Sequence, residues 1–350
     1  MLNLKRGNLL EEKTEALVNT VNCVGVMGRG LALQFKRAFP ENFKQYQKAC
    51  KNGEVQPGQM FTVDMGLLLN PRYIINFPTK RHWRQKSRIE DIQSGLEALV
   101  EEVRSRRINS IAIPPLGCGN GGLSWNDVKP LIVQVFKSLP EVEVVLFEPA
   151  GAPAPSDMTV RTSKPKMTGA RAALIQVLER YGLPGYRMSR IEIQKLAYFL
   201  KAAGEPALQD LKYSRFHYGP YSKDLDHAVG RMEGHYIRGY GDGSDRAQVR
   251  ELPDGHKAAQ EFLEKEQTAN QYLERVSQLI EGFETPYGME MLATLHWVAQ
   301  EDAQAAQDCE VAIKRVQEWS DRKKNLFKPR HLKIAWEHLK TQGWLTQSHS

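Results

Sequence analysis

Hydrophobic and polar positions follow one pattern in the first part of the chain and another in the second. Up to residue 148, short apolar or β-branched runs alternate with segments in which apolar residues recur every three to four positions. The runs predict β-strands over residues 16–22, 59–65, 73–79, 110–115 and 142–147. The periodic segments predict helices over residues 31–39, 42–50, 89–106 and 125–139. This alternation predicts an α/β fold, with a mixed or parallel sheet between helices on both faces.

The later part of the chain has mainly helical periodicity. Apolar residues occupy one helix face at Ile193, Leu196, Ala197 and Leu200. The spacing recurs at Leu292, Leu295, His296 and Ala299, and again at Ala312, Val316 and Trp319. Residues 236–240 are a weak strand-like exception to this helical pattern.

A stretch rich in proline and poor in large apolar residues separates the two patterns. This composition is typical of a linker and covers residues 151–168. We therefore expect one domain over residues 1–150, a linker over 151–168 and a mainly helical domain over 169–350. The length of 350 residues fits two domains of roughly 100–200 residues each.

Composition narrows the class of protein. Hydrophobic residues make up 41% and charged residues 25% of the chain, which excludes collagen-like, coiled-coil and disordered proteins. We expect neither a membrane span nor a secretory signal, because no long apolar run is present. The four cysteines lie far apart without a C-x-x-C pair, which argues against a zinc site and against a disulfide framework. Cysteines without disulfides are typical of the reducing cytoplasm.

The net charge of +7 comes from the first domain and the linker. Residues 1–150 hold 20 Lys and Arg against 15 Asp and Glu, residues 151–168 hold three against one, and residues 169–350 hold 25 of each. A basic surplus suits an anionic ligand or nucleic acid, and it suits equally a solvated surface without a partner.

A glycine-rich loop follows the expected strand 16–22 and opens a helix. It contains Gly25, Gly28 and Gly30. Glycine allows close approach of the backbone, and helix N-terminal amides attract anions, so the loop is a candidate phosphate site. Asn22 can donate and accept hydrogen bonds, which suits a ribose hydroxyl. A plain strand-to-helix turn is the alternative.

A second glycine-rich loop follows the expected strand 110–115. Gly117, Gly119, Gly121 and Gly122 stand within six residues, more than a turn needs. Three of them match the dinucleotide fingerprint, which leaves an NAD-dependent dehydrogenase as an alternative. That fingerprint belongs at the first strand of a βαβ unit, however, and this loop precedes the last strand. Two such loops at two strand ends indicate a cleft that grips a diphosphate from both sides.

The first domain resembles a macrodomain, the fold that binds ADP-ribose. Gly7-Asn8-Leu9-Leu10 resembles the family's G-D-[IL] turn, Val18-Asn19-Thr20-Val21-Asn22 its V-N-A-A-N strand, and the glycine loops its two phosphate loops. Pro78-Thr79-Lys80-Arg81-His82-Trp83, with the helix after it, resembles the branch of terminal ADP-ribose glycohydrolases. In that branch a lysine after the strand is catalytic.

The second domain contains IQKLAYFL (193–200) and FHYGPYS (216–222), which resemble a Panacea-like antitoxin domain. A macrodomain joined to this element resembles the DarG-type antitoxins. The resemblance implies that the first domain hydrolyses ADP-ribose from thymidine bases of single-stranded DNA. It also implies that the second domain binds and neutralises a DarT-type DNA ADP-ribosyltransferase toxin. The alternative is a non-catalytic ADP-ribose reader fused to a protein-interaction domain.

The site residues fall into three groups. The resemblance implies that Lys80 with Asn22 would be catalytic. The residues themselves suggest that DNA contacts Arg81, His82, Trp83 and Arg84, because an aromatic ring in a basic run suits single-strand binding, and a solvated loop with Trp83 folded onto the domain is the alternative. ADP-ribose would contact Asn8, Leu9, Asn19, Gly28, Arg29, Gly30, Leu31, Thr79, Pro115, Gly117, Cys118, Gly119, Asn120, Gly121, Gly122 and Leu123. We expect no cofactor and no metal, because the loops hold no cluster of His, Asp and Glu.

The catalytic chemistry stays open at several points. Lys80 can act as a nucleophile or proton carrier only if its pKa is lowered by burial or by the nearby cations Arg81, Arg84, Lys86 and Arg88. A solvated loop lysine without a catalytic role is the alternative. The family has an aspartate where this chain has Gly121. Either Lys80 acts with water and Asn22, or the substrate's phosphates assist, or Gly121 leaves room for a bulky nucleotide. Cys118 is expected to be a small packing residue rather than a nucleophile.

Two further replacements concern binding. Asn8 stands where the family has an acidic residue that contacts adenine, and its side-chain oxygen can still accept a hydrogen bond. The second domain has acidic residues that could imitate DNA toward a toxin or simply be solvated, namely Asp224, Asp226, Glu233, Asp242 and Asp245.

Overall fold

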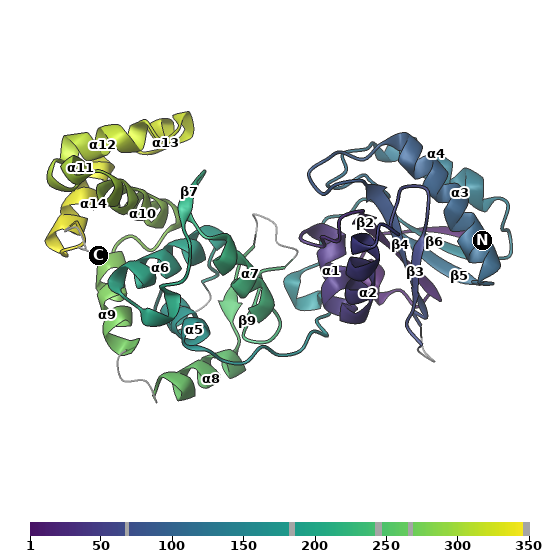
Figure 1. Ribbon diagram of the computed structural model, residues 1–350, viewed down its shortest axis with the longest axis horizontal. Helices are drawn as coiled ribbons and strands as arrows, with labels where there is room; N and C mark the ends of the chain where they lie inside the picture. The colour runs from purple at the N-terminus through teal and green to yellow at the C-terminus, as the bar shows by residue number, and fades with distance from the viewer. Residues whose placement is uncertain (67–69, 182–185, 242–246, 265–268, 346–350) are drawn as a thin grey trace. The chain divides into compact units, whose positions relative to one another are not determined.

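The computed structural model describes residues 1–66, 70–181, 186–241, 247–264 and 269–345. The chain divides into two compact units, with a boundary between Ser163 and Lys164 (Figure 1). Each unit has its own hydrophobic core. In the described part of the chain no helix is long and apolar enough to span a bilayer.

The first unit is built on a six-stranded sheet. The strand order is β1 (Leu2–Lys5), β6 (Glu143–Phe147), β5 (Ser110–Ile113), β2 (Ala16–Asn22), β4 (Tyr73–Lys80) and β3 (Phe61–Asp64). Neighbouring strands are parallel except β3, which runs antiparallel to β4. The expected mixed sheet is confirmed, while β1 is a strand that the hydrophobic pattern did not reveal.

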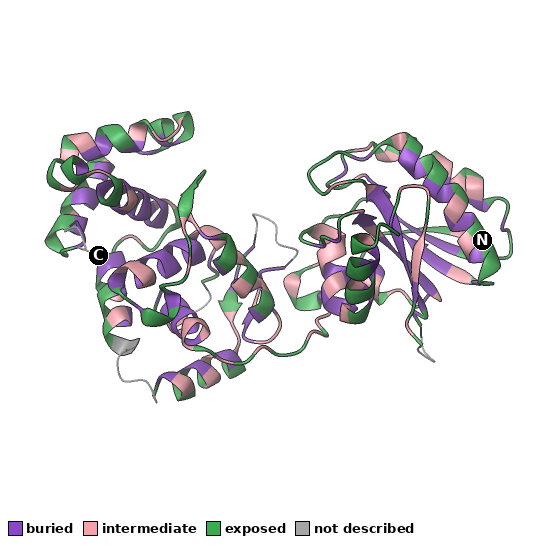
Figure 2. Cartoon of the chain, viewed as in Figure 1, coloured by how far each residue is buried: buried purple, intermediate pink, exposed green. Residues whose placement is uncertain are grey.

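Helices cover both faces of this sheet (Figures 1 and 2). Successive side chains of a strand point to opposite faces of the sheet, and both sets are buried here. Leu17 of β2 packs with Phe35 and Phe39 beside α1 (Gly30–Ala38) and α2 (Pro40–Lys51). Val18 faces the other core, formed with α3 (Ile89–Ser105) and α4 (Trp125–Phe136). Gly95 lets α3 approach the sheet, since a Cβ there would lie 2.3 Å from the Phe77 ring.

Residues expected in the linker are partly packed on the first unit. Met158 is buried after a short 3-10 turn at Pro155–Asp157. The Arg161 amide donates a hydrogen bond to the Arg37 carbonyl at 2.9 Å. The first compact unit therefore continues to Ser163.

The second unit is mainly helical, as the periodicity predicts. Its helices are α5 (Gly169–Tyr181), α6 (Arg190–Ala203), α7 (Lys223–Met232), α8 (Pro253–Leu263), α9 (Ala269–Ile280), α10 (Pro286–Glu301), α11 (Ala303–Gln307), α12 (Cys309–Gln317), α13 (Asp321–Leu326) and α14 (Pro329–Thr341). The expectation that Trp319 belongs to a helix with Ala312 and Val316 is wrong. The helix α12 ends at Gln317, and the Trp319 indole donates a hydrogen bond to the Phe216 carbonyl at 3.0 Å.

Two short antiparallel ribbons complete the second unit. The strand-like residues 236–240 contain β9 (Ile237–Arg238), which pairs with β10 (Arg250–Glu251). The FHYGPYS segment instead forms part of a hairpin of β7 (Ser214–Phe216) and β8 (Gly219–Tyr221). Helix α6 holds this hairpin, because Lys195 Nζ donates to the Pro220 carbonyl at 2.7 Å.

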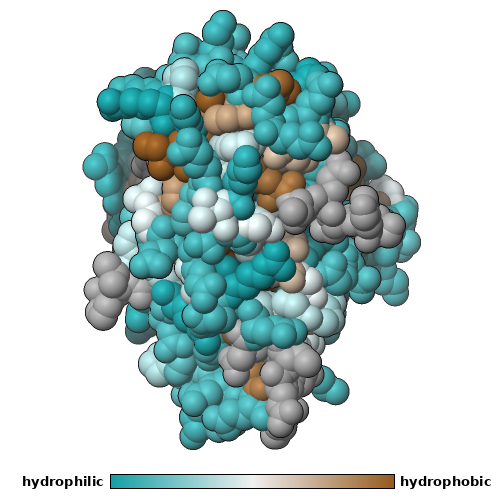
Figure 3. Space-filling view, turned by 90° about the vertical axis from the view of Figure 1, so that its left-hand side faces the viewer, coloured by the Kyte–Doolittle hydropathy of each residue, from teal (hydrophilic) through white to brown (hydrophobic). Residues whose placement is uncertain are grey.

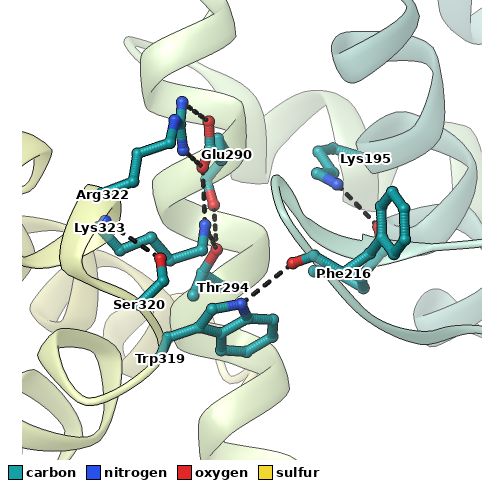
Figure 4. A network of polar contacts seen from close by, with 9 residues as sticks. Lys195, Phe216, Glu290, Thr294, Trp319, Ser320, Arg322 and Lys323 are labelled. Carbon is teal, nitrogen blue, oxygen red and sulfur yellow. Dashed lines mark hydrogen bonds and ion pairs between the residues drawn. The ribbon is translucent and has the colours of Figure 1, made fainter.

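A polar network joins α10 to α13 inside the second unit (Figure 4). The fully buried Lys323 donates to Glu290 at 2.6 Å and to Thr294 at 3.0 Å. Arg322 makes two hydrogen bonds to the same Glu290 carboxylate, at 2.6 and 3.0 Å. The buried ammonium therefore has a paired charge, as burial of an ion requires.

Candidate functional site

The carboxyl ends of three neighbouring parallel strands, β5, β2 and β4, lie at one edge of the first unit's sheet. The two glycine loops and residues 81–88 leave from these strand ends, where α/β sheets bind ligands. Asn120 of the second loop contacts both the first loop and Lys80 at the end of β4. Its carbonyl accepts a hydrogen bond from Lys80 Nζ, and a Cβ on Gly30 would lie 3.1 Å from its Nδ2. The fold thus brings the two glycine loops together beside Lys80.

Lys80 ends β4 directly opposite Asn22 of β2, after a register shift in the pairing of these strands. Burial is the main cause that lowers the pKa of Lys80, and the nearby charge of Lys86 lowers it further. A lowered pKa increases the fraction of neutral amine, the form that acts as a nucleophile or base. Among the cations considered from the sequence, Arg81 is instead paired with Asp91 at 3.0 Å.

The Asn22 side chain shapes the first glycine loop. Its Nδ2 donates to the Val26 carbonyl at 2.6 Å, and its Oδ1 accepts from the Val24 amide at 3.0 Å. The buried Tyr46 hydroxyl donates to the Asn22 carbonyl at 2.6 Å. These bonds fix the loop and the end of β2, so the geometry supports a positioning role for Asn22 beside Lys80.

The second glycine loop is packed tightly against Ser87. The Ser87 amide donates to the Gly121 carbonyl at 3.0 Å. A Cβ on Gly121 would lie 2.2 Å from the Gly117 carbonyl oxygen and 2.3 Å from Ser87 Oγ. Gly121 is therefore required by the packing of the loop itself, and room for a nucleotide beside it stays a prediction. In this loop conformation an aspartate cannot stand there, because its Cβ has no space.

Two helix N-termini follow the glycine loops. Gly28, Arg29, Gly30 and Leu31 lead into α1, and no side chain caps the α1 N-terminus. Gly117, Cys118, Gly119, Gly122 and Leu123 lead toward α4, whose N-terminus likewise has no side-chain cap. Gly117 and Gly122 have φ angles of 71° and 80°, which favour glycine. Backbone amides of this kind suit an anionic group.

Other expected ADP-ribose contacts are less accessible. Asn19 is fully buried, and its Nδ2 donates to Asn76 Oδ1 at 3.0 Å within the core. Thr79 and Leu9 are also buried, and Pro115 is half-buried at the end of β5. Asn8 begins a 3-10 turn at Leu9–Glu11, and its Nδ2 donates to Glu11 Oε1 at 2.9 Å. A carboxylate therefore does lie at this turn, on Glu11 rather than on residue 8.

The expected DNA-binding residues form a partly exposed rim after β4. Trp83 is 45% exposed, its ring stacks on His82 with centroids 5.4 Å apart, and the Arg84 guanidinium lies 4.6 Å from its centroid. Arg81 differs, because its guanidinium is engaged by Asp91. The exposed indole and Arg84 have the chemistry needed to stack a base and to contact a phosphate.

Cys118 does not have the environment of a nucleophile. Burial, followed by the charge of Asp127, raises the pKa of its thiol to about 11. The thiolate is the reactive form of cysteine, so a raised pKa disfavours attack at neutral pH. Its partial burial against the core supports the packing role expected from the sequence.

The candidate acidic residues that the structure describes do not form one open face. Glu233 is buried and accepts a hydrogen bond from the Tyr240 amide at 2.8 Å. Asp226 is paired with Arg190. Asp224 is exposed at the start of α7, whereas Asp242 and Asp245 lie outside the described residues.

Sequence reasoning missed two contacts in this site. Ser87 packs against Gly117 and Gly121 of the second loop, and Lys86 lies beside Gly122, which is 36 residues away along the chain. Lys86 was visible only as one cation in a basic run. No local pattern marks a serine that contacts a distant loop.

Comparisons with known proteins identify the family of this chain. The Macro domain family model matches residues 18–132. A DNA ADP-ribosyl glycohydrolase of Thermus aquaticus is 47% identical and covers 99% of this chain and 94% of that protein. One from Mycobacterium tuberculosis is 41% identical and covers 97% and 99%, respectively. A Thermosipho africanus DNA ADP-ribosyl transferase-DNA ADP-ribosyl glycohydrolase fusion protein is 37% identical over 42% of each chain. Identity over nearly the whole length shows that this chain belongs to the DarG family of DNA ADP-ribosyl glycohydrolases.

Proposed function

We propose that the first unit hydrolyses ADP-ribose from thymidine bases of single-stranded DNA. The single observation that carries the proposal is Lys80, whose pKa burial lowers, at the meeting point of two glycine loops. The loops supply amides for a diphosphate, and Lys80 supplies the reactive amine. Family membership supports the same reaction.

The proposed chemistry uses the neutral amine of Lys80 as a nucleophile. The amine attacks C1″ of the ribose, and the bond from C1″ to the thymine nitrogen breaks. Its electron pair stays on thymine, which takes a proton from water. A second water then displaces the neutral lysine amine from C1″, the proton that this water loses passes to the hydroxide left by the first water, and ADP-ribose is released. Asn22 would hold the first loop in place during both steps.

The test uses a single-stranded oligonucleotide that carries one ADP-ribosylated thymidine. Full-length protein and the Lys80→Ala variant are incubated with it, and the products are resolved by mass. We expect the wild-type chain to release ADP-ribose and the variant to be about 10²–10⁴-fold slower. The exposed Lys48→Ala on α2 is the matched control. Equal release by both chains would remove Lys80 from the mechanism, and release by neither would favour an ADP-ribose reader.

We further propose that the second unit binds and neutralises a DNA ADP-ribosyltransferase toxin. The fused transferase and glycohydrolase in the Thermosipho relative support such a pairing. The face of the molecule in Figure 3 is mainly hydrophilic with small separated apolar spots, so a partner there would make largely polar contacts. Co-expression of residues 164–350 with the toxin tests this proposal, because separate elution on size exclusion would contradict it.

The proposed partners are ADP-ribosylated single-stranded DNA, ADP-ribose and this toxin, and the proposed location is the cytoplasm. The four cysteines are free thiols, as a reducing compartment favours. If all four cysteines react with an alkylating reagent added to intact cells, they are free thiols there, and this result would support the location. Recovery of a disulfide-linked form would contradict it.

A further inference from the structure

Lys86 lies across the second glycine loop. An ideal Cβ on Gly122 would be 3.0 Å from Lys86 Nζ and 3.3 Å from its Cδ. The neighbouring Ser87 anchors the same segment to the loop through its amide bond to Gly121. The Lys86 ammonium is therefore held beside the backbone of this loop rather than pointing away from it.

The charge of Lys86 has no carboxylate partner among the residues that the structure describes. Arg81, in the same segment, is paired with Asp91 instead. Lys86 is exposed, yet it lies near enough to Lys80 to affect its titration. An ammonium without a carboxylate partner, close to both Lys80 and a glycine loop, is an arrangement that favours an anion.

Part of the backbone beside Lys86 is already hydrogen-bonded within the loop, since the Gly122 and Leu123 amides donate to the Gly119 and Gly117 carbonyls at 3.1 Å. Among the residues that the structure describes, the amides of Gly119, Asn120 and Gly121 have no such acceptor and remain for an anion. Gly117 and Gly122 both have positive φ angles, and the α4 N-terminus beyond them has no side-chain cap. Amides in such turns and at helix N-termini bind phosphate, and a lysine commonly adds a point charge to them. The second loop and Lys86 together thus offer amides and a cation to one phosphate group.

We infer that Lys86 is a phosphate-binding residue of this site and holds the diphosphate of ADP-ribose on the 117–122 loop. This inference rests on the proposed function and adds a residue to the site. A phosphodiester of the DNA strand has the same chemistry. The position of Lys86 over the loop, rather than on the outer rim with Trp83, favours the diphosphate.

The test measures binding of free ADP-ribose, adenosine and an unmodified thymidine oligonucleotide to the full chain by calorimetry. Lys86→Ala should weaken ADP-ribose binding about tenfold, the scale of one charge-assisted hydrogen bond at an exposed position. Adenosine binding should not change, because adenosine has no phosphate. Lys86→Arg should restore most of the ADP-ribose affinity.

The matched control is Lys137→Ala, an exposed lysine just after the other end of α4, roughly 18 Å from its N-terminus. It should leave all three affinities unchanged. Unchanged ADP-ribose affinity in Lys86→Ala would overturn the inference, as would a loss seen only with the oligonucleotide. A wild-type chain that binds no ADP-ribose would refute the proposed function itself, which is a different outcome.

Discussion

Gly121 is the residue at which the second loop admits no side chain. The Gly117 carbonyl and Ser87 Oγ occupy the position of a Cβ. This explains in physical terms why the loop carries no carboxylate there, and the charged groups beside the loop are Lys80 and Lys86. In the proposed mechanism, catalysis without that aspartate depends on the pKa of Lys80.

Gly121→Ala should destabilise the first unit by about 1–3 kcal/mol, because the added methyl forces the loop to shift. ADP-ribose affinity should fall with it. Gly119→Ala is the matched control for stability, since nothing lies within 4 Å of its Cβ position. Thermal unfolding of the full-length chains measures both. Equal unfolding of the two variants would show that the loop is not packed as described.

The rate of ADP-ribose release (kcat) should rise with pH and then level off as Lys80 loses its proton. Its pKa is lowered by burial and by Lys86, so the neutral amine forms at a lower pH than in an ordinary lysine. Lys86→Met removes a like charge, which raises the pKa of Lys80 and moves the rising limb to higher pH. Profiles of kcat under saturating substrate separate this effect from binding. An unmoved limb would show that Lys86 does not act on Lys80.

At the scale of elements, ion pairs hold the last helices of the second unit together. Glu290 of α10 accepts hydrogen bonds from Arg322 and the buried Lys323 of α13. The hairpin of β7 and β8 lies nearby and accepts two hydrogen bonds, one from Lys195 of α6 and one from the Trp319 indole (Figure 4). The exposed Phe216 and Tyr218 are therefore carried by a firmly held ribbon.

Glu290→Gln should destabilise the second unit by about 3–5 kcal/mol, because it leaves the Lys323 ammonium buried without a counter-charge. Arg322→Gln should cost less, since the Arg322 side chain is 44% exposed and can be solvated. Chemical denaturation of the full chain, followed through the second unit's tryptophans, compares the two variants. A larger effect of Arg322→Gln would contradict this account of the network.

At the scale of the whole molecule, the two units differ in how acid should affect them. His82 is the one histidine up to Ser163, and it lies in a partly exposed loop. The second unit contains the buried His296, whose Nδ1 shares a hydrogen bond of 2.7 Å with the Tyr198 hydroxyl. Burial, followed by the charge of Arg275, lowers the pKa of His296 to about 4.

Acid should therefore weaken the second unit through His296. The unfolded chain binds a proton at this residue near pH 6.5, whereas the folded chain does so only near pH 4. Stability is full above pH 6.5 and falls by up to about 3 kcal/mol as the pH drops to 4. Hydrogen exchange of α10 at several pH values measures the slope. His296→Gln should flatten it, and an unchanged slope would exclude this residue as the cause.

The sequence by itself determined the alternation of strands and helices and the two glycine loops, whereas Lys80 was singled out only by the family resemblance. These features are local, because hydrophobic period and glycine content act within a few residues. The strand β1 escaped this reasoning, since only one of its four residues is even half-buried and it shows no clear alternation. Its place in the sheet depends on pairing with β6, about 140 residues away.

Only the tertiary structure decided how the site is assembled. It joined Lys80 to Asn120, turned Asn19 into the core, paired Arg81 with Asp91, and placed Ser87 and Lys86 on the second loop. Apart from Arg81 with Asp91, these contacts join residues some 30 to 60 positions apart. They follow from strand order and helix packing, which a local pattern of residues does not specify.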